Sequence, residues 1–363
     1  MDKLLDLYTD YLQVTFRYAT ATGLSSLLDG AVSHDQVTRF LSKPAKGSKD
    51  LWRLVKPLVR QHESEDACLI FDDSIIEKPH TDESELICWH YDHTKNTSVK
   101  GINLLTAFYH SQAAGAELAL RIPVGFQCVH KPIRFSDLKT QKERRKSNVN
   151  KNELLRQMFS QCLQNQLKFR YVLADSWYAS AENMRFIHNK EKYFIFDLKS
   201  NRKAALTDED RNKGRWQRID ELPIAEHTPV QVWLKDLNIK LLLVKQVFTN
   251  KDQSTGVRYL VSNDLNLTYQ RFETLFQKRW SVEEYHKSIK QNAAAGKSPT
   301  RTLRTQTNHL FAAILTYVKM ERYKFASNLN HFALKSRLYV VAIKAAFKEL
   351  NQFKDLIAPE QAA

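Results

Sequence analysis

Two short apolar runs that contain aspartates place the strongest constraint on the fold of this chain. CLIFDDSII begins at Cys68 and contains Asp72 and Asp73, and KFRYVLADSWYAS begins at Lys168 and contains Asp175. Both runs are short and hold β-branched and aromatic residues, so we expect buried strands rather than helices. The sequence therefore predicts an α/β core with carboxylates at the ends of its strands.

The segments around these runs indicate the order of the core. Residues 101–110 and 116–129 are expected to be the second and third strands of a meander, and 193–200 a fifth strand. Residues 142–166 read as a basic loop followed by an amphipathic helix, and 180–190 as a second helix. The order β-β-β-α-β-α-β is that of a ribonuclease-H-like α/β fold with a mixed sheet, in which the first strand is central.

The chain divides into regions of different expected secondary structure. Residues 1–65 read as short helices that either form a small DNA-binding module or pack on the main domain. Residues 66–200 hold the first part of the core, and 201–265 read as a β-rich insertion of short strands. Residues 266–300 contain a helix that completes the core, and 301–363 form a helical C-terminal region.

The charge of the chain indicates its kind of partner. It has 55 Lys and Arg against 40 Asp and Glu, a formal net charge of +15. A polyanion is the expected partner, and nucleic acid is the commonest one. A membrane is disfavoured because the basic residues are scattered and no apolar run reaches about 18 residues. The N-terminus lacks the apolar core of a signal peptide, so we expect a cytoplasmic protein.

Two further classes of site are disfavoured. The four cysteines are widely spaced and form no CxxC pair, which predicts reduced thiols rather than a zinc site. The chain has no glycine-rich phosphate loop, so we expect no nucleotide cofactor.

The stretch RWSVEEYHKSIK, at 279–290, adds a third acid. On a helix, Arg279, Glu283, Lys287 and Lys290 share one face, because residues three and four apart are neighbours. This stripe is either a solvated set of ion pairs or a site in which Glu283 binds something. Asp72 and Asp175 favour the second reading, in which Glu283 is part of a site. The ends of the first and fourth strands are adjacent in this fold, and a late helix can lie across them.

The motifs resemble those of the DDE transposases of bacterial insertion sequences and are similar to the insertion-sequence-four family. CLIFDDSI resembles the family's apolar strand ending in D-x-S/T, which selects Asp72 with Ser74. YVLADSWY resembles the strand that ends in the second aspartate, Asp175. The resemblance spans about residues 66 to 320.

The late helix resembles the family's Y-x2-R-x3-E-x6-K signature. Arg279, Glu283 and Lys290 fit this spacing, but Phe276 occupies the tyrosine position. This departure indicates either that the ring matters for packing or that a contact from a phenol to DNA is absent.

The resemblance implies a transposase that binds terminal inverted repeats, cleaves phosphodiester bonds and joins the 3′-hydroxyl ends to target DNA. It implies a cut-and-paste reaction that could cleave the second strand through a DNA hairpin, and a homodimer that holds two ends. Asp72, Asp175 and Glu283 would hold two Mg²⁺ (or Mn²⁺) ions, since such hard ions prefer carboxylate oxygens.

Alternatives remain open at several of these positions. Asp73 could replace Asp72, because a shift of one residue turns a strand's side chains to the other face. Asp175 could instead cap the following helix. At the level of function, the alternatives are a ribonuclease-H-like nuclease that cuts DNA without joining it, and a catalytically inactive DNA-binding protein.

Basic and aromatic side chains provide candidates for DNA contacts. The candidates for phosphate binding are Arg279, Lys287, Lys290, Lys78 and Lys100, with Lys95 and the run KERRK at 142–146 as weaker ones. The candidates for stacking on a displaced base are Trp177, Trp216 and Trp233. Ion pairing and core packing are the competing explanations for these side chains.

Overall fold

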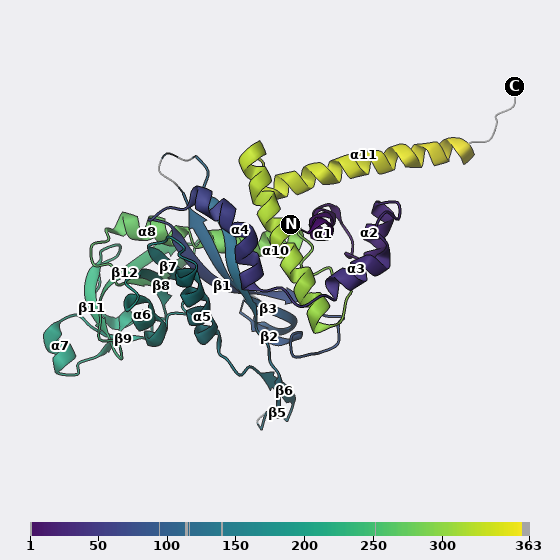
Figure 1. The fold of residues 1–363 in the computed structure, drawn as a ribbon. Coiled ribbons are helices and arrows are strands. Elements are labelled where there is room, and N and C mark those ends of the chain that lie inside the picture. The colour runs from purple at the N-terminus through teal and green to yellow at the C-terminus, as the bar shows by residue number, and fades with distance from the viewer. Residues whose placement is uncertain are drawn as a thin grey trace. The chain divides into compact units, whose positions relative to one another are not determined.

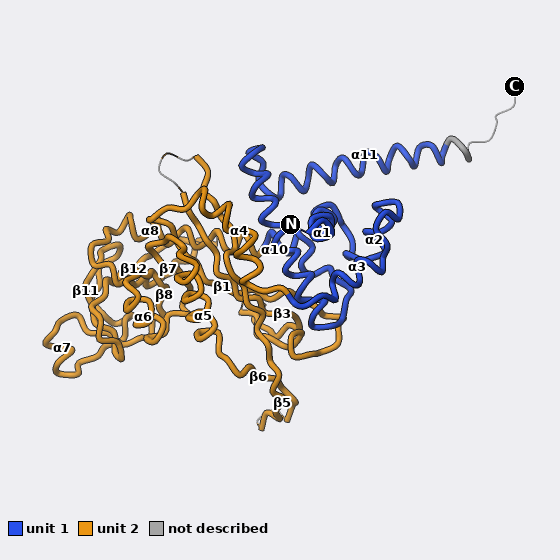
Figure 2. Tube along the Cα trace, in the orientation of Figure 1, with its two compact units in different colours: residues 1–45, 287–363 blue, residues 46–286 orange. Residues whose placement is uncertain are grey.

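The computed structural model describes residues 2–93, 95–112, 115, 117–138, 141–250 and 252–357. The chain forms two compact units, which Figure 2 shows in different colours. Unit 1 contains residues 1–45 and 287–363, and unit 2 contains residues 46–286.

Five strands of unit 2 are neighbours towards one end of a mixed sheet (Figure 1). They are β1 (Cys68–Glu77), β3 (Thr97–Ser111), β4 (Leu120–Cys128), β7 (Tyr171–Ala174) and β8 (Tyr193–Leu198). β3 pairs antiparallel with both β1 and β4, whereas β7 pairs parallel with both β1 and β8. The order β4-β3-β1-β7-β8 puts β1 in the middle. The mixed α/β class is confirmed, and this order is consistent with a ribonuclease-H-like core.

The segment predicted as a β-rich insertion continues the same sheet. Its strands are β9 (Lys203–Ala205), β10 (Gln217–Arg218), β11 (Val230–Leu234), β12 (Lys240–Thr249) and β13 (Thr255–Ser262). β13 pairs antiparallel with β8, and the sheet then runs through β12, β11 and β9 to β10. A helix, α7 (Asp208–Asn212), and a 3-10 helix, η1 (Ile219–Glu221), connect these strands. The insertion therefore widens the core sheet by antiparallel pairing.

Three strands were missed by the sequence reasoning. β2 (Cys88–Asp92) pairs with the first part of β3. β5 (Ile133–Ser136) and β6 (Glu143–Lys146) form a separate two-stranded hairpin. The prediction that KERRK is a loop is wrong, because four of its five residues lie in β6.

Helices cover the two faces of the sheet in unit 2. α4 (Ser48–His62) packs on β4, α5 (Lys151–Gln164) on β3 and β4, and α6 (Ala181–His188) on β8. α5 begins at an Asn150 cap, and its buried residues recur every three or four positions, the pattern of an amphipathic helix. After β13 the chain forms α8 (Tyr269–Gln277) and α9 (Trp280–Gln291).

Side chains of β3 alternate between these helices, as expected for a strand. Phe108 packs against Tyr285 of α9, with ring centroids 5.1 Å apart, and His110 Nδ1 lies 3.2 Å from Ser281 Oγ. Ala107, the residue before Phe108, faces the side of the sheet where α4 and α5 pack, since a Cβ at Gly125 would contact both Ala107 and Met158 of α5. α9 and α5 therefore cover opposite faces.

Unit 1 is helical. Its helices are α1 (Lys3–Val14), α2 (Ala21–Leu27), α3 (His34–Leu41), α10 (Leu303–Ser327) and α11 (His331–Ile357). α1 packs on α10, where the Tyr8 hydroxyl lies 2.9 Å from His309 Nδ1. Among the helices described, none is both long and apolar enough to cross a membrane. The predicted range 1–65 is helical, but α4 within it belongs to unit 2.

Candidate active site

The register of two parallel strands brings Asp72 and Asp175 together. β1 and β7 pair from Cys68 with Tyr171 to Phe71 with Ala174. The next residue on each strand is an aspartate, so both carboxylates follow the last pair. Asp72 was predicted at the end of its strand. β1 in fact continues to Glu77 against β3, and Asp72 marks only the end of the parallel pairing.

Asp175 begins a turn after β7. Its Oδ1 accepts a hydrogen bond from the backbone N–H of Trp177, at 3.0 Å, which fixes the carboxylate at the strand end. The helix that follows, α6, is capped by Ser180 instead. The alternative reading of Asp175 as the cap of that helix therefore has no support.

Asp72 and Asp73 point to opposite faces of the sheet. Asp72 Oδ2 lies 3.7 Å from His286 Nδ1 of α9. On the α5 side, Asp73 accepts hydrogen bonds from Lys151 Nζ at 2.8 Å, from Asn103 Nδ2 at 2.7 Å and from the Tyr178 hydroxyl. Only Asp72 shares a face with α9, the helix that carries Glu283.

The two aspartates differ in how the protein balances their charge. Burial first, and then repulsion from Asp175, Asp73 and Glu283, together raise the pKa of Asp72 to about 8, against the opposing effect of Arg279. Burial would also raise the pKa of Asp73, but the Lys151 ammonium and the three hydrogen bonds lower it below its usual value. Asp73 is thus compensated within the protein, while Asp72 is not.

Asp175 adds to the uncompensated charge. Its pKa is raised by burial and by Asp73, against the opposing effects of Arg279 and two backbone N–H groups. Carboxylates that converge in a poorly solvated site repel one another, and a bound cation relieves that repulsion. The Asp72 and Asp175 pair therefore has the donor chemistry and the charge that suit a hard divalent ion.

Glu283 lies in the first turn of α9 and is paired with Arg279 one turn earlier. Its side chain is 32% exposed, so it can change its partner without unpacking a core. Within the described ranges, no three His, Cys, Asp or Glu side chains are grouped as a metal site. A third carboxylate ligand would thus require Glu283 to leave Arg279. Its neighbour Glu284 turns outward and pairs with Arg121.

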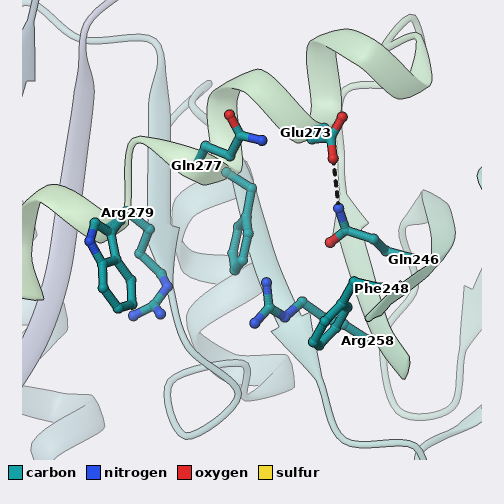
Figure 3. A pocket seen from close by; sticks show the side chains of 8 residues that line it. Gln246, Phe248, Arg258, Glu273, Gln277 and Arg279 are labelled. Carbon is teal, nitrogen blue, oxygen red and sulfur yellow. Dashed lines mark hydrogen bonds between the residues drawn. The ribbon is translucent and has the colours of Figure 1, made fainter. Parts of the chain in front are cut away.

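A pocket of about 470 Å³ opens beside Arg279 (Figure 3). It is lined by residues of β12, β13, α8 and α9, namely Gln246, Phe248, Arg258, Glu273, Phe276, Gln277, Arg279 and Trp280. The guanidinium carbons of Arg258 and Arg279 lie 5.4 and 5.7 Å from the ring centroid of Phe276. Phe276 therefore uses its ring for packing beneath two guanidinium groups.

Trp280 and Arg258 are site candidates that the sequence reasoning missed. Trp280 is 61% exposed and follows Arg279 directly, on the rim of the same pocket. An exposed indole beside a guanidinium group is a suitable surface for a nucleotide base and its phosphate. The signal available in the sequence was a tryptophan inside the signature helix itself.

The structure separates the other predicted DNA contacts. Lys78 is 3% exposed, and burial lowers its pKa to about 8, so its side chain is not presented to a ligand at the surface. Lys100 is half-buried on β3, and Lys95 is paired with Glu77 at 2.6 Å. Lys287 and Lys290 are exposed on the last part of α9, which belongs to unit 1.

Of the three predicted stacking residues, Trp177 is the most open. It is 48% exposed, lies two residues after Asp175, and has the ammonium groups of Lys151 and Lys199 at 4.9 and 5.8 Å from its ring. Trp233 is covered by Arg211 at 3.9 Å, and its indole N–H donates to Asp208. Trp216 is half-buried in the loop before β10.

The fold and the site define an α/β protein with a carboxylate centre suited to metal-dependent chemistry. The family model described as the Transposase DDE domain matches residues 139–319, about half of the chain. This match supports a DDE transposase, a class that acts on DNA by metal-dependent cleavage and transfer. The matched range includes Asp175 and Glu283 but not Asp72. No curated protein matched the chain.

Proposed function

We propose that this chain is a transposase of the insertion-sequence-four type, which cuts DNA at terminal inverted repeats and joins the 3′-hydroxyl ends to target DNA. The observation that carries the proposal is the meeting of Asp72 and Asp175 at the end of the β1–β7 pairing. Their raised pKa values indicate negative charge that the surrounding protein does not neutralise. Inactive descendants of an enzyme have no need to keep so costly an arrangement.

The proposed catalytic residues are Asp72, Asp175 and Glu283, which would hold Mg²⁺ or Mn²⁺. Two such ions, when bound, activate the attacking hydroxyl and stabilise the leaving oxygen. His286 packs against Asp72 and limits the directions that its carboxylate can take. Asp73 is assigned a supporting role, because its charge is already used by Lys151.

The proposed DNA contacts are basic and aromatic side chains. Arg279 is the cation that affects both Asp72 and Asp175, so it is suited to hold the phosphate next to the cut bond. Arg258 and Trp280 extend that contact into the pocket. Lys100, Lys287 and Lys290 remain candidates for more distant phosphates, whereas Lys78 is left out because it is buried.

The proposed assembly is a homodimer that holds two DNA ends. Its support lies in α11, which exposes a set of apolar side chains that a monomer would leave in water. These are Phe332, Tyr339, Val340, Val341, Ile343, Phe347, Leu350 and Phe353. Cleavage of the second strand through a DNA hairpin is part of the proposal by resemblance alone.

The test is cleavage of DNA that carries the terminal repeats flanking this gene, with Mg²⁺ present. Wild type is expected to cut, whereas Asp72→Asn, Asp175→Asn and Glu283→Gln should bind the DNA but not cut it. Glu284→Gln is the matched control, since it removes a carboxylate from the same helix turn but not from the site, and it should cut normally. Cleavage by a pure sample of Glu283→Gln would refute the assignment of that residue.

A second assay separates the proposal from its alternatives. DNA with a pre-cleaved 3′-hydroxyl end is mixed with a target plasmid and the wild-type protein. Joined products identify a transposase, whereas cleavage without joining identifies a nuclease. Binding without either reaction would identify a DNA-binding protein that has no catalytic activity.

A further inference from the structure

The β5–β6 hairpin has no role in the centre described above. It lies between β4 and α5 and projects from the sheet of unit 2 (Figure 1). All four residues of β5 are exposed, and so are three of the four in β6. An isolated two-stranded hairpin is marginally stable in water, so contacts with the rest of the protein or with a partner are needed to hold it.

One face of the hairpin is held to the protein. Arg145 Nε donates to Glu83 Oε1 at 2.9 Å, and the Arg145 side chain is only 10% exposed. On the same face, Arg134 pairs with Glu143 at 3.4 Å. The base of the hairpin is therefore anchored by the buried Arg145 guanidinium group, together with the contacts of β6 with β2.

The opposite face combines basic with apolar side chains, and its Arg144 and Lys146 contact Asp137 and the Phe135 ring within the hairpin itself. Ile133 pairs with Lys146, and Phe135 pairs with Arg144, and directly opposed residues in antiparallel strands share a face. Ile133 and Phe135 are both exposed, and Leu138 in the connecting turn is 92% exposed. These five residues form what we call the ribbon face.

The charges of the hairpin favour an anionic partner. The acids described in this segment are Glu143, which pairs with Arg134, and Asp137, which pairs with Arg144 at 3.2 Å. Lys142 and Lys146 add further positive charge at exposed positions. A protein partner that was purely apolar would leave these charges without solvent or counter-ions, at a cost.

We propose that the β5–β6 hairpin enters a groove of duplex DNA, with Arg144 and Lys146 on the phosphates and Ile133 and Phe135 against sugars or base edges. The major groove, about 12 Å wide, admits a two-stranded β-ribbon. This inference rests on the proposed function, because it takes duplex DNA as the ligand. It assigns a contact that lies outside the carboxylate centre.

The chain limits how far this contact lies from the cut. Lys146 ends β6, and Lys151, five residues later, bonds to Asp73 beside the catalytic centre. Five residues span at most about 18 Å, and the two side chains add roughly 10 Å. At about 3.4 Å per base pair, the base of the hairpin is within roughly ten base pairs of the bond that is cut.

The experiment measures the affinity for duplex DNA that extends about 20 base pairs on each side of the cut. It compares the full-length wild type with a double variant that carries both Arg144→Ala and Lys146→Ala. The matched control is Lys190→Ala with Lys203→Ala, which removes two exposed charges near α6 and β9, outside the hairpin. Two lost phosphate contacts should weaken binding by roughly 10- to 100-fold at 0.1 M salt. The slope of log affinity against log salt should fall by about two.

A charge-conserving variant separates the loss of charge from a loss of folding. Arg144→Lys with Lys146→Arg should restore the slope, which shows that charge rather than hairpin folding is measured. If the alanine variant binds the duplex DNA with the affinity and the salt dependence of wild type, the proposal is overturned. The same holds if the salt dependence of the alanine variant is unchanged and the variant instead loses self-association in sedimentation.

The outcome is separable from that of the proposed function. If wild type cuts DNA and the alanine variant binds as wild type does, only the hairpin assignment fails. If wild type neither binds nor cuts duplex DNA, the proposed function fails, and the hairpin proposal fails with it.

Discussion

Asp72 and Asp73 are consecutive residues of β1, yet the protein neutralises only the second of them. Asp73 has a lysine, a tyrosine and an asparagine as donors, whereas Asp72 faces Asp175 and the acidic turn of α9. The strand alternation that separates their side chains also separates their roles. We propose that Asp73 stabilises the fold and that Asp72 is left for an external cation.

Asp73→Asn should destabilise the protein without removing a metal ligand. The change leaves the Lys151 ammonium without its counter-charge, and breaking such a pair costs about 3 kcal/mol where it is buried. The free energy of unfolding in urea is the measurement. Adding Lys151→Met to Asp73→Asn should recover much of the loss, because no unpaired charge then remains. A stable Asp73→Asn protein that no longer cuts DNA would instead identify Asp73 as the ligand.

The stability of the metal-free protein should fall as the pH rises through the range set by Asp72. Its pKa is about 8 in the folded chain against 3.8 as a model value, so the folded state holds the proton more tightly. The stabilisation is complete below about pH 4 and is lost as the pH rises towards 8. Thermal unfolding in EDTA should show a steeper decline between pH 5 and pH 8 for wild type than for Asp72→Asn.

The same linkage predicts how Mg²⁺ acts. Because the ion competes with the proton for Asp72, it should raise the melting temperature more at pH 8 than at pH 5.5. Asp72→Asn serves as the control and should show little of this pH-dependent gain. Equal gains for both proteins at both pH values would show that Asp72 does not take part in binding.

The core of the fold could be predicted because its strands are unusually clear. Runs such as CLIFDDSII are apolar, short and bounded, and an acid that follows a buried strand is a distinct signal. The hairpin was not predictable in this way, because KERRK has no apolar alternation and pairs with a segment seven to thirteen residues away. Charge alone made it look like a loop.

The pocket beside Arg279 could not have been found from the sequence. Arg258 reaches it from β13 and Trp280 from α9, and only the antiparallel extension of the sheet brings them together. Lys78, in contrast, was predicted as a DNA contact but is buried. A lysine in a polar stretch is normally exposed, so nothing in the sequence indicated this burial. Both cases depend on tertiary packing, which local patterns do not record.

Trp280→Ala should weaken binding to the DNA end. Stacking of a base on an aromatic ring contributes about 1–3 kcal/mol, so the affinity should fall by roughly 5- to 100-fold. Trp280→Phe should retain part of the binding affinity, because it keeps an aromatic ring. Trp89→Ala is the matched control, as Trp89 is 55% exposed on β2 and lies outside the pocket. An equal loss in both alanine variants would remove the special role of Trp280.

The exposed apolar side chains of α11 should govern self-association. Val340 and Phe347 are seven residues apart and are therefore on the same side of the helix, both in contact with solvent. Val340→Lys with Phe347→Lys should convert a dimer to a monomer in sedimentation and leave the melting temperature of the monomeric unit unchanged. Ala342→Lys with Glu349→Lys places two lysines seven residues apart on the other side of the same helix, at exposed positions, and should leave the dimer intact. If the charged variant remains dimeric, α11 is not the interface, and the apolar stripe must be explained by another partner.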